Sequence, residues 1–188
     1  PGHTATYLKE ARDVFGFTNF QFVDGNKSDK VLSAVGAEAI AGKMGTAPGG
    51  GPQIPAYKNF AEQLKKKFGH DRVPPFTGSA YDAGMVIGLA AARAIAMNGG
   101  DLNGKTLRDH LRPVANPGGQ EIVGGDMDSI VAGLEAIKKG EDVNYTGAAG
   151  ACDFDKNGDV KTPIEVWNFT EGGTESATIV NATDIPSE

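Results

Sequence analysis

The sequence predicts an α/β fold with parallel strands, and three stretches carry this prediction. Residues 1–46 alternate between helix and strand patterns, and such an alternation builds a parallel sheet. Residues 47–55 contain three glycines and three prolines, a composition typical of a linker. Near the C-terminus two apolar runs, Gly150–Phe154 and Ile164–Phe169, flank the turn-forming segment Asp155–Asp159. A strand pair placed this late in a helix-rich chain indicates a crossing between two domains.

The N-terminal segment predicts two helices and two strands. Thr4 lies where a cap is needed for a helix over residues 5–14, whose apolar side chains form one stripe. Asn19–Val23 predicts a short apolar strand, which a polar turn follows. A second helix is expected over residues 28–35, and residues 37–46 end in a second strand.

Four further helices are predicted after the linker. They cover residues 56–68, 79–97, about 104–114 and 128–139, and the Gly-rich segment 116–125 is expected to be a loop. The longest of them, with Ser79 as its expected cap, is rich in alanine and glycine and apolar almost all round. This composition predicts a buried helix that packs closely against its neighbours.

Composition and charge exclude several classes of function. A chain of 188 residues with 39% hydrophobic and 22% charged residues can form one ordinary core or two small ones. The net charge of -6 argues against a nucleic-acid partner, which needs a basic face. No uninterrupted run of about 18 apolar residues occurs, so no membrane-spanning segment is expected. The chain opens on a helix pattern with no signal peptide, which leaves a cytoplasmic protein or a fragment of a longer one.

One motif suggests a nucleotide site. Residues 99–106 (GGDLNGKT) match GxxxxGK[ST], in which Lys105 would reach the terminal phosphate and Thr106 would hold magnesium. Such a loop follows a buried strand, whereas the residues before it predict a helix. The other interpretation is a helix–loop–helix in which Asn103 caps the second helix. A P-loop-type nucleotide-binding protein using Gly99–Thr106 is therefore kept as the alternative function.

The sequence shows no catalytic or metal-binding constellation. Residues 153–159 imitate the first half of a calcium loop, but the twelfth position is Ile164, where such a loop needs glutamate. The three histidines lie far apart, and the single cysteine, Cys152, is expected to be a small core residue. We therefore predict a protein that is not an enzyme and that uses no cofactor and no metal.

Asp24 is the best candidate for a ligand contact. It directly follows the predicted strand at residues 19–23, and ligands of α/β sheets bind at the carboxyl ends of strands. A carboxylate there could pair with an ammonium group or accept hydrogen bonds from ligand hydroxyls. The alternative is an aspartate that only stabilises the turn.

Three segments carry a family resemblance. They are FVDGNKSDKVLSAVGAEAIAGKMGTAP (22–48), FGHDRVPPFTGSAYDAGMVIGLAAARA (68–94) and GLEAIKKGEDVNYTGAAGACDFDKNGDVKTPIEVWNF (133–169). Together they resemble the branched-chain amino acid (leucine/isoleucine/valine) type of ABC-transporter substrate-binding protein, a type I periplasmic binding protein family. The likeness extends to about Thr178, and its last segment is the most specific.

The resemblance implies a type I periplasmic-binding-protein-like fold, in which hinge strands join two parallel-sheet lobes. A complete member is roughly twice this length, in agreement with the size of two domains. The chain would then be the C-terminal half of such a protein. Residues 1–46 would be the C-terminal part of lobe 2 and 47–55 a hinge linker, while 56–163 would be the C-terminal part of lobe 1 and 164–188 the strand crossing back to lobe 2, with the tail.

The resemblance also implies a function. The chain would belong to the solute-binding component of an ABC importer, which captures an amino acid or a similar small polar ligand between its lobes. Its partners would be that ligand, a membrane permease, and either the N-terminal half of the same protein or a second copy of this chain. Such a protein is periplasmic or extracellular, with a lipoprotein anchor as one form. A ligand sensor or regulator built on the same fold is a further alternative.

The resemblance points to four ligand-binding residues. Asp24 falls on the second-lobe loop where an acidic residue receives the ligand's ammonium, and Asn26 lies on the same loop. Phe76 and Thr77 match a first-lobe stretch that contacts the ligand. The residues that hold the ligand's carboxylate belong to the half that this chain does not contain.

Overall fold

Local signals set the helix boundaries in the computed structural model, which describes residues 2–186 except 50, 72 and 75. Ser28 caps a helix because its Oγ accepts the backbone N–H of Lys30 (3.2 Å). Gly36 ends that helix with a φ of 94°, a value that favours glycine. Asp126 caps a later helix through the backbone N–H groups of residues 128 and 129.

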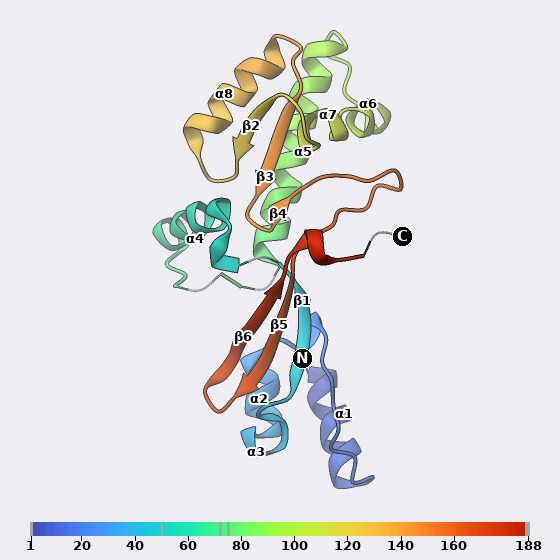
Figure 1. Ribbon diagram of the computed structural model, residues 1–188, viewed down its shortest axis with the longest axis vertical. Helices are drawn as coiled ribbons and strands as arrows, with labels where there is room; N and C mark the ends of the chain where they lie inside the picture. Colours follow the sequence, from blue (N-terminus) through green and yellow to red (C-terminus); the bar gives the residue numbers. More distant parts are fainter. Residues whose placement is uncertain (1, 50, 72, 75, 187–188) are drawn as a thin grey trace. The chain divides into compact units, whose positions relative to one another are not determined.

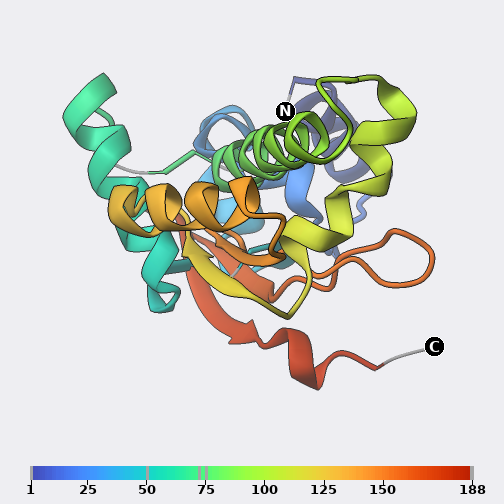
Figure 2. The same cartoon turned by 90° about the horizontal axis from the view of Figure 1, so that it is seen from above.

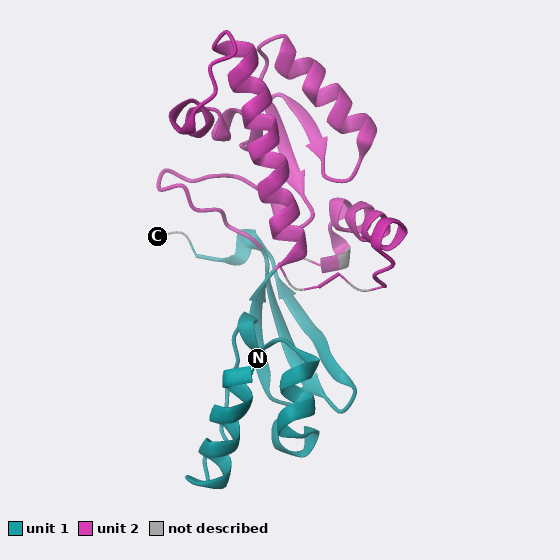
Figure 3. Cartoon of the chain, turned by 180° about the vertical axis from the view of Figure 1, so that it is seen from behind, with its two compact units in different colours: residues 1–48, 163–188 teal, residues 49–162 magenta. Residues whose placement is uncertain are grey.

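The chain divides into two units, which are described separately (Figure 3). Unit 1 consists of residues 1–48 and 163–188, and unit 2 consists of residues 49–162. The chain therefore enters unit 2 after Pro48 and leaves it after Thr162.

Unit 1 combines an antiparallel sheet with short helices (Figure 1). The strand order is β1-β5-β6, and both neighbouring pairs are antiparallel. Phe22 adds a parallel bridge to Gly45 of β1. The elements of this unit are α1 (Gly2–Asp13), the 3₁₀ turn η1 (Asp24–Asn26), α2 (Asp29–Val35), α3 (Ala37–Ile40), β1 (Met44–Pro48), β5 (Ile164–Thr170), β6 (Gly173–Val180) and the 3₁₀ turn η3 (Ala182–Asp184).

Aromatic rings form the centre of the unit 1 core. Trp167 and Phe169 of β5 are fully buried, and Phe22 packs with them. The ring of Phe169 lies edge-on to Trp167 and to Phe22, with centroid distances of 5.0 and 5.1 Å. Each such pair contributes about 0.5–1.5 kcal/mol beyond area burial. Apolar residues of the three helices enclose the rings, namely Leu8, Val31, Leu32, Val35 and Ile40.

Unit 2 is built on a short sheet of order β2-β3-β4. β2 and β3 are parallel, with Ile122 opposite Tyr145, and the helix α8 connects them. β4 returns antiparallel along the end of β3. The elements are the 3₁₀ turn η2 (Gly51–Gln53), α4 (Pro55–Phe68), α5 (Thr77–Met97), α6 (Gly104–Asp109), α7 (Leu111–Ala115), β2 (Gln120–Val123), α8 (Met127–Lys138), β3 (Val143–Gly147) and β4 (Gly150–Ala151).

One face of the unit 2 sheet is covered by helices. Ile122, Val143 and Tyr145 are buried against α5 and α8, which lie side by side over them (Figure 2). Gly133 lets α8 approach closely, because a Cβ there would lie 2.1 Å from Cδ1 of Ile122. The residues that alternate with this buried set are half-buried or exposed: Glu121, Val123, Asn144 and Thr146. The unit therefore has one packed face and one open face.

The predicted α/β class is confirmed, and most of the predicted helices form with small shifts at their ends. The helix expected over residues 104–114 is two helices, α6 and α7, and Thr4 lies inside α1 instead of capping it. The parallel sheet expected for residues 1–46 is also wrong, since β1 pairs antiparallel with β5 and only Phe22 bridges it in parallel. The predicted pairing of the two C-terminal apolar runs is wrong. Residues 150–151 pair with β3, whereas 164–170 pair with β1 and β6. Strand partners depend on packing that local sequence does not encode. The turn between the runs does form, and the bridge between Phe154 and Val160 closes it.

Three other expectations need correction. Asn19–Val23 contributes the single bridging residue Phe22 and no longer strand. The Gly-rich segment 116–125, expected to be a loop, contains β2. Ser79 does not cap α5, which already begins at Thr77.

The long helix α5 is less buried than its composition predicts. Ile87 and Ile95 are about half exposed, although Val86, Leu89, Ala90 and Ala94 are buried. Within the described part of the chain, α5 has the length and composition of a membrane-spanning helix, contrary to the sequence expectation. A core helix passes the same test, so this is weak support for a membrane span. The exposed apolar side chains show instead that one face of α5 is uncovered.

Candidate ligand-binding site

The turn at Asp24–Asn26 forms the unit 1 part of the candidate site. The backbone N–H of Asn26 donates to Val23 O (2.9 Å) and that of Lys27 donates to Asp24 O (3.0 Å), which closes the turn. The Asn26 side chain accepts the Val23 N–H (3.2 Å) and donates to Thr4 Oγ1 (2.9 Å). Asn26 therefore fixes the turn to α1, and its amide is already hydrogen-bonded on both atoms.

Asp24 is the free acidic group of this turn. Its side chain is half-buried, and Oδ1 accepts the N–H of Gly25 (2.5 Å). Among the described residues no hydrogen bond or ion pair engages Oδ2. The neighbouring cation, Lys27, is instead paired with Glu165 of β5. The carboxylate thus keeps an oxygen that can accept from an external donor.

Phe76 and Thr77 begin α5 in unit 2. Phe76 has a φ of 65°, the one positive φ of a non-glycine residue in the described ranges, and the residue is 48% exposed. A bulky residue in this region of φ is strained, and such strain persists only where the surrounding structure holds it. The Phe76 carbonyl accepts the N–H of Ala80 (2.9 Å), and the N–H of Thr77 donates to Pro74 O (3.2 Å). The aromatic ring is therefore presented at the helix start by a held backbone.

Asp82, five residues after Thr77 on α5, is a buried carboxylate that the sequence interpretation missed. It is 3% exposed and accepts the hydroxyl of Tyr145 (2.9 Å) and the backbone N–H groups of Ala148 and Ala149 (2.7 Å each). Burial raises the pKa of Asp82, and the three hydrogen bonds oppose that rise. Burial, followed by the nearby Asp82 charge, also holds the pKa of Tyr145 far above its usual value. An aspartate inside an apolar helix is the signal that could have revealed this group.

An apolar cavity of about 380 Å³ lies beside Asp82 within unit 2. Its thirteen lining residues come from α5, α7, the turn before β4, β4 itself and the segment that follows it, and most are apolar, including Ala83, Val86, Ile87, Leu111 and Phe154. Cys152 also lines it, and burial raises the pKa of this thiol to about 12. The thiol is therefore protonated at neutral pH and is a poor nucleophile.

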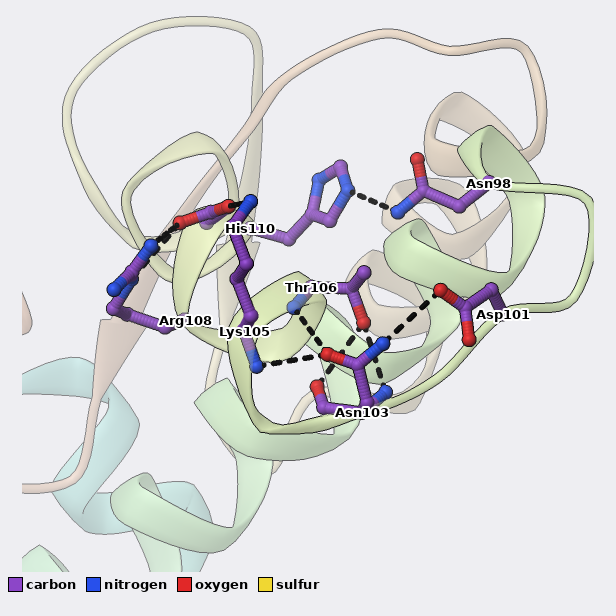
Figure 4. A network of polar contacts seen from close by, with 8 residues as sticks. Asn98, Asp101, Asn103, Lys105, Thr106, Arg108 and His110 are labelled. Carbon is purple, nitrogen blue, oxygen red and sulfur yellow. Dashed lines mark hydrogen bonds and ion pairs between the residues drawn. The ribbon is translucent and has the colours of Figure 1, made fainter.

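The motif at residues 99–106 does not have the geometry of a phosphate loop (Figure 4). It follows α5, whereas a phosphate loop follows a strand. Asn103 Oδ1 accepts the N–H groups of Lys105 (3.0 Å) and Thr106 (3.1 Å), as a helix cap does. The Thr106 hydroxyl accepts the Asn103 N–H (2.9 Å), and Lys105 pairs with Asp109 (3.1 Å). The side chains needed for phosphate and magnesium are thus engaged in holding the start of α6.

The segment that imitates a calcium loop is a tight turn. Asp155 Oδ1 accepts the N–H groups of Asn157 (2.8 Å) and Asp159 (2.9 Å), and Gly158 has a φ of 94°. These hydrogen bonds lower the pKa of Asp155, with the Asp159 N–H as the largest cause. In the ranges that the structure describes, no group of three or more His, Cys, Asp or Glu could hold a metal ion.

The structure places the four predicted ligand residues in both units. In unit 1 it puts Asp24 and Asn26 in one turn, and in unit 2 it puts Phe76 and Thr77 at the start of α5. Asp24 keeps one carboxylate oxygen without a hydrogen bond to any described residue, and Phe76 is about half exposed, whereas Asn26 is used to hold its own turn.

Comparisons with known proteins identify similar folds. The leucine-binding protein LivK of Thermotoga maritima is 23% identical, with a TM-score of 0.66 over 98% of this chain and 43% of LivK. The branched-chain amino acid transporter substrate-binding protein LivJ of Streptococcus pneumoniae, solved in complex with isoleucine, is 15% identical, with a TM-score of 0.61 over 95% of this chain and 42% of LivJ. A search of curated proteins found no match.

These likenesses confirm the predicted type I periplasmic-binding-protein fold, and this chain spans less than half the length of LivK and LivJ. The family model for the receptor family ligand binding region matches residues 5–172, which is most of the chain. The chain therefore belongs to the family of proteins that contain the receptor family ligand binding region.

Proposed function

We propose that this chain is part of the solute-binding component of an ABC importer and captures an amino acid or a similar small polar ligand. Two similar structures support the proposal, since one is a leucine-binding protein and the other a transporter substrate-binding protein that holds isoleucine. In this proposal residues 1–46 and 164–188 belong to one lobe and residues 56–163 to the other. Residues 47–55 are the hinge linker, and the ligand binds between the lobes.

The observation that carries the proposal is the free oxygen of the Asp24 carboxylate. A half-buried carboxylate that has no cation partner among the described residues is a site for the ammonium group of an amino acid, because a charge-assisted hydrogen bond gains strength where water is excluded. The exposed ring of Phe76 supplies an apolar wall for the ligand side chain, and Thr77 supplies a hydroxyl. Asn26 acts by fixing the turn that presents Asp24.

The proposed role involves no bond-making chemistry. The ligand shifts an equilibrium between open and closed lobes, because it makes some contacts only in the closed state. The protein would then deliver its ligand to a membrane permease, which places it in the periplasm or on the cell surface.

We further propose that the rest of the same protein covers the open face of unit 2. LivK and LivJ have more than half of their length outside the matched part, and a segment of that size is large enough to complete both units. It would also cover the exposed Ile87 and Ile95 of α5, which packs on the other face of the β2–β3 sheet, and the apolar cavity. Charged residues of α5 argue against a lipid cover, since Asp82 is buried in the unit and Arg93 is paired with Asp142.

The covering segment can be tested by thiol labelling of Ile87→Cys in a Cys152→Ser background. Labelling should be fast in the 188-residue chain and at least about tenfold slower when the residues encoded upstream of Pro1 are included. Equal rates in the two proteins, or an α5 that becomes protected only in lipid vesicles, would contradict the proposal. Without the cover, the chain should self-associate in analytical ultracentrifugation and bind its ligand weakly.

The ligand assignment is tested by titration with L-leucine, L-isoleucine and 4-methylpentanoate, which is leucine without its ammonium group. Asp24→Asn should weaken binding of both amino acids by about 10- to 100-fold, the size of a lost charge-assisted hydrogen bond. It should leave the weak binding of 4-methylpentanoate unchanged. Glu175→Gln, an exposed acidic residue on β6, is the matched control and should bind as the wild type does. Equal losses for all three ligands would remove Asp24 from the site.

A further inference from the structure

We propose that Asp82 is a positioning residue that clasps the Ala148–Ala149 turn to the start of α5 and thereby holds Phe76 and Thr77 in place. The inference deepens the proposed function and rests on it for the role of Phe76 and Thr77. The clasp itself is a property of unit 2 and can be tested without a ligand.

The carboxylate binds the turn through two consecutive backbone amides. The N–H of Ala148 donates to Oδ1 and the N–H of Ala149 donates to Oδ2, each at 2.7 Å. This two-point contact fixes the distance and the orientation of the turn, as paired charge-assisted hydrogen bonds do. Tyr145 adds a third donor at Oδ1, so all three polar partners are donors and suit an ionised carboxylate.

One glycine makes room for this contact, and a second lies near it. A Cβ on Gly147 would lie 2.2 Å from the Asp82 carboxyl carbon, so the carboxylate occupies the space that a side chain would need. Gly78 lies one helical turn before Asp82 on the same face of α5. A Cβ built on Gly78 meets Ala148 Cβ at 3.5 Å, an ordinary van der Waals distance. The turn therefore lies close to α5 at two successive levels, and it is hydrogen-bonded to α5 at the Asp82 level.

Tyr81, the residue before Asp82, makes a second set of contacts that hold the start of α5. The hydroxyl of Tyr81 accepts the backbone N–H of Gly125 (3.1 Å), which ties α5 to the loop that follows β2. Its ring packs on Phe60 of α4 with a centroid distance of 4.9 Å. The first turns of α5 are thus held from two sides, and the strained φ of Phe76 lies directly before them.

A buried charge is weak support for a purely stabilising role. Well-packed apolar residues often replace such groups without loss of stability, whereas a carboxylate fixes polar partners at defined positions. The Asp82 carboxylate therefore positions the Ala148–Ala149 turn and, through it, the start of α5.

The test compares Asp82→Asn with Tyr145→Phe in the 188-residue chain. Asparagine keeps an oxygen for Ala148 and Tyr145 but presents an amino group to the N–H of Ala149, so that the clasp opens. Phenylalanine removes the third hydrogen bond and leaves both turn contacts intact. Amide exchange at Ala149 and Ala80 should be at least about tenfold faster in Asp82→Asn than in Tyr145→Phe, once each is scaled by its global stability.

The wild-type exchange pattern and the affinity for L-isoleucine test the clasp independently of how well Asp82→Asn folds. In the wild-type chain at low denaturant, Ala148, Ala149 and Ala80 should exchange through one common opening, and separate openings would overturn the clasp even if Asp82→Asn does not fold. Affinity for L-isoleucine should fall about tenfold in Asp82→Asn and stay unchanged in Tyr145→Phe. If the wild-type chain binds no amino acid, the proposed function is wrong. If the amides of Ala149 and Ala80 exchange at equal rates in the two variants, the clasp is wrong.

Discussion

Gly45 of β1 packs directly beneath the indole ring of Trp167, and a Cβ at position 45 would lie 2.5 Å from Cζ2 of that ring. Both residues belong to unit 1, where they are opposite each other in the β1–β5 register. The absence of a side chain at position 45 is therefore what allows the largest ring of the core to pack closely against the strand.

Gly45→Ala should destabilise the chain by about 1–3 kcal/mol, because the added methyl forces the buried ring off its position. Urea unfolding followed by Trp167 fluorescence measures this loss. Gly84→Ala is the matched control, since its Cβ meets nothing within 4 Å and the residue lies inside α5. That control should raise the free energy of unfolding by about 0.5–1 kcal/mol. A tolerated alanine at position 45 would show that the ring is not tightly seated.

The Lys27–Glu165 ion pair ties the end of the Asp24 turn to β5, and the two side chains are only 19% and 16% exposed. Lys27→Ala should therefore cost about 1–3 kcal/mol, because it leaves Glu165 partly buried without its cation. Lys138→Ala breaks an exposed pair with Glu135 and should cost no more than about 0.5 kcal/mol. Equal unfolding free energies for the two variants would mean that the partly buried pair is no stronger than a surface one.

Asp82 predicts a specific dependence of stability on pH. Burial raises its pKa in the folded protein above the ordinary value of 3.8, so the folded state holds the proton more tightly than the unfolded state. The contribution of this group is therefore most favourable below pH 3.8 and is lost as pH rises through the folded pKa. The free energy of unfolding of wild type relative to Asp82→Asn should fall as pH rises from 3 toward neutrality. A difference that is flat or rises with pH would contradict the raised pKa.

If residues 99–106 form a helix cap, Asn103 matters for stability and Lys105 does not bind nucleotide, whereas a phosphate loop would need Lys105 for nucleotide binding. Asn103→Ala should destabilise the chain by about 1 kcal/mol, since it removes the acceptor for two N–H groups of α6. Lys105→Ala should change stability by less than about 0.5 kcal/mol, since its ion pair with Asp109 is exposed. Titration with ATP and magnesium should show no binding to wild type or to either variant. Binding by wild type that Lys105→Ala abolishes would restore the nucleotide alternative.

The sequence alone determined the features that depend on near neighbours in the chain. The Ser28 cap and the Gly36 stop of α2, the Asn103 cap of α6 and the turn held by Asp155 are all predicted from residues a few positions apart. Their hydrogen bonds close within one turn of chain, so their signals are local. The family resemblance in three segments likewise predicted the fold that the comparisons confirm.

The tertiary structure decided what depends on distant partners. β5 pairs with β1 and β6 although the run at 150–154 precedes it more closely than β1, because register follows burial of Trp167 and Phe169. β2 forms inside a Gly-rich segment because β3 supplies its hydrogen bonds. Asp82 becomes a clasp because the Ala148–Ala149 turn, more than sixty residues away, delivers two amides to it. Each of these outcomes needs a group that is remote in sequence, and folding alone brings that group into contact.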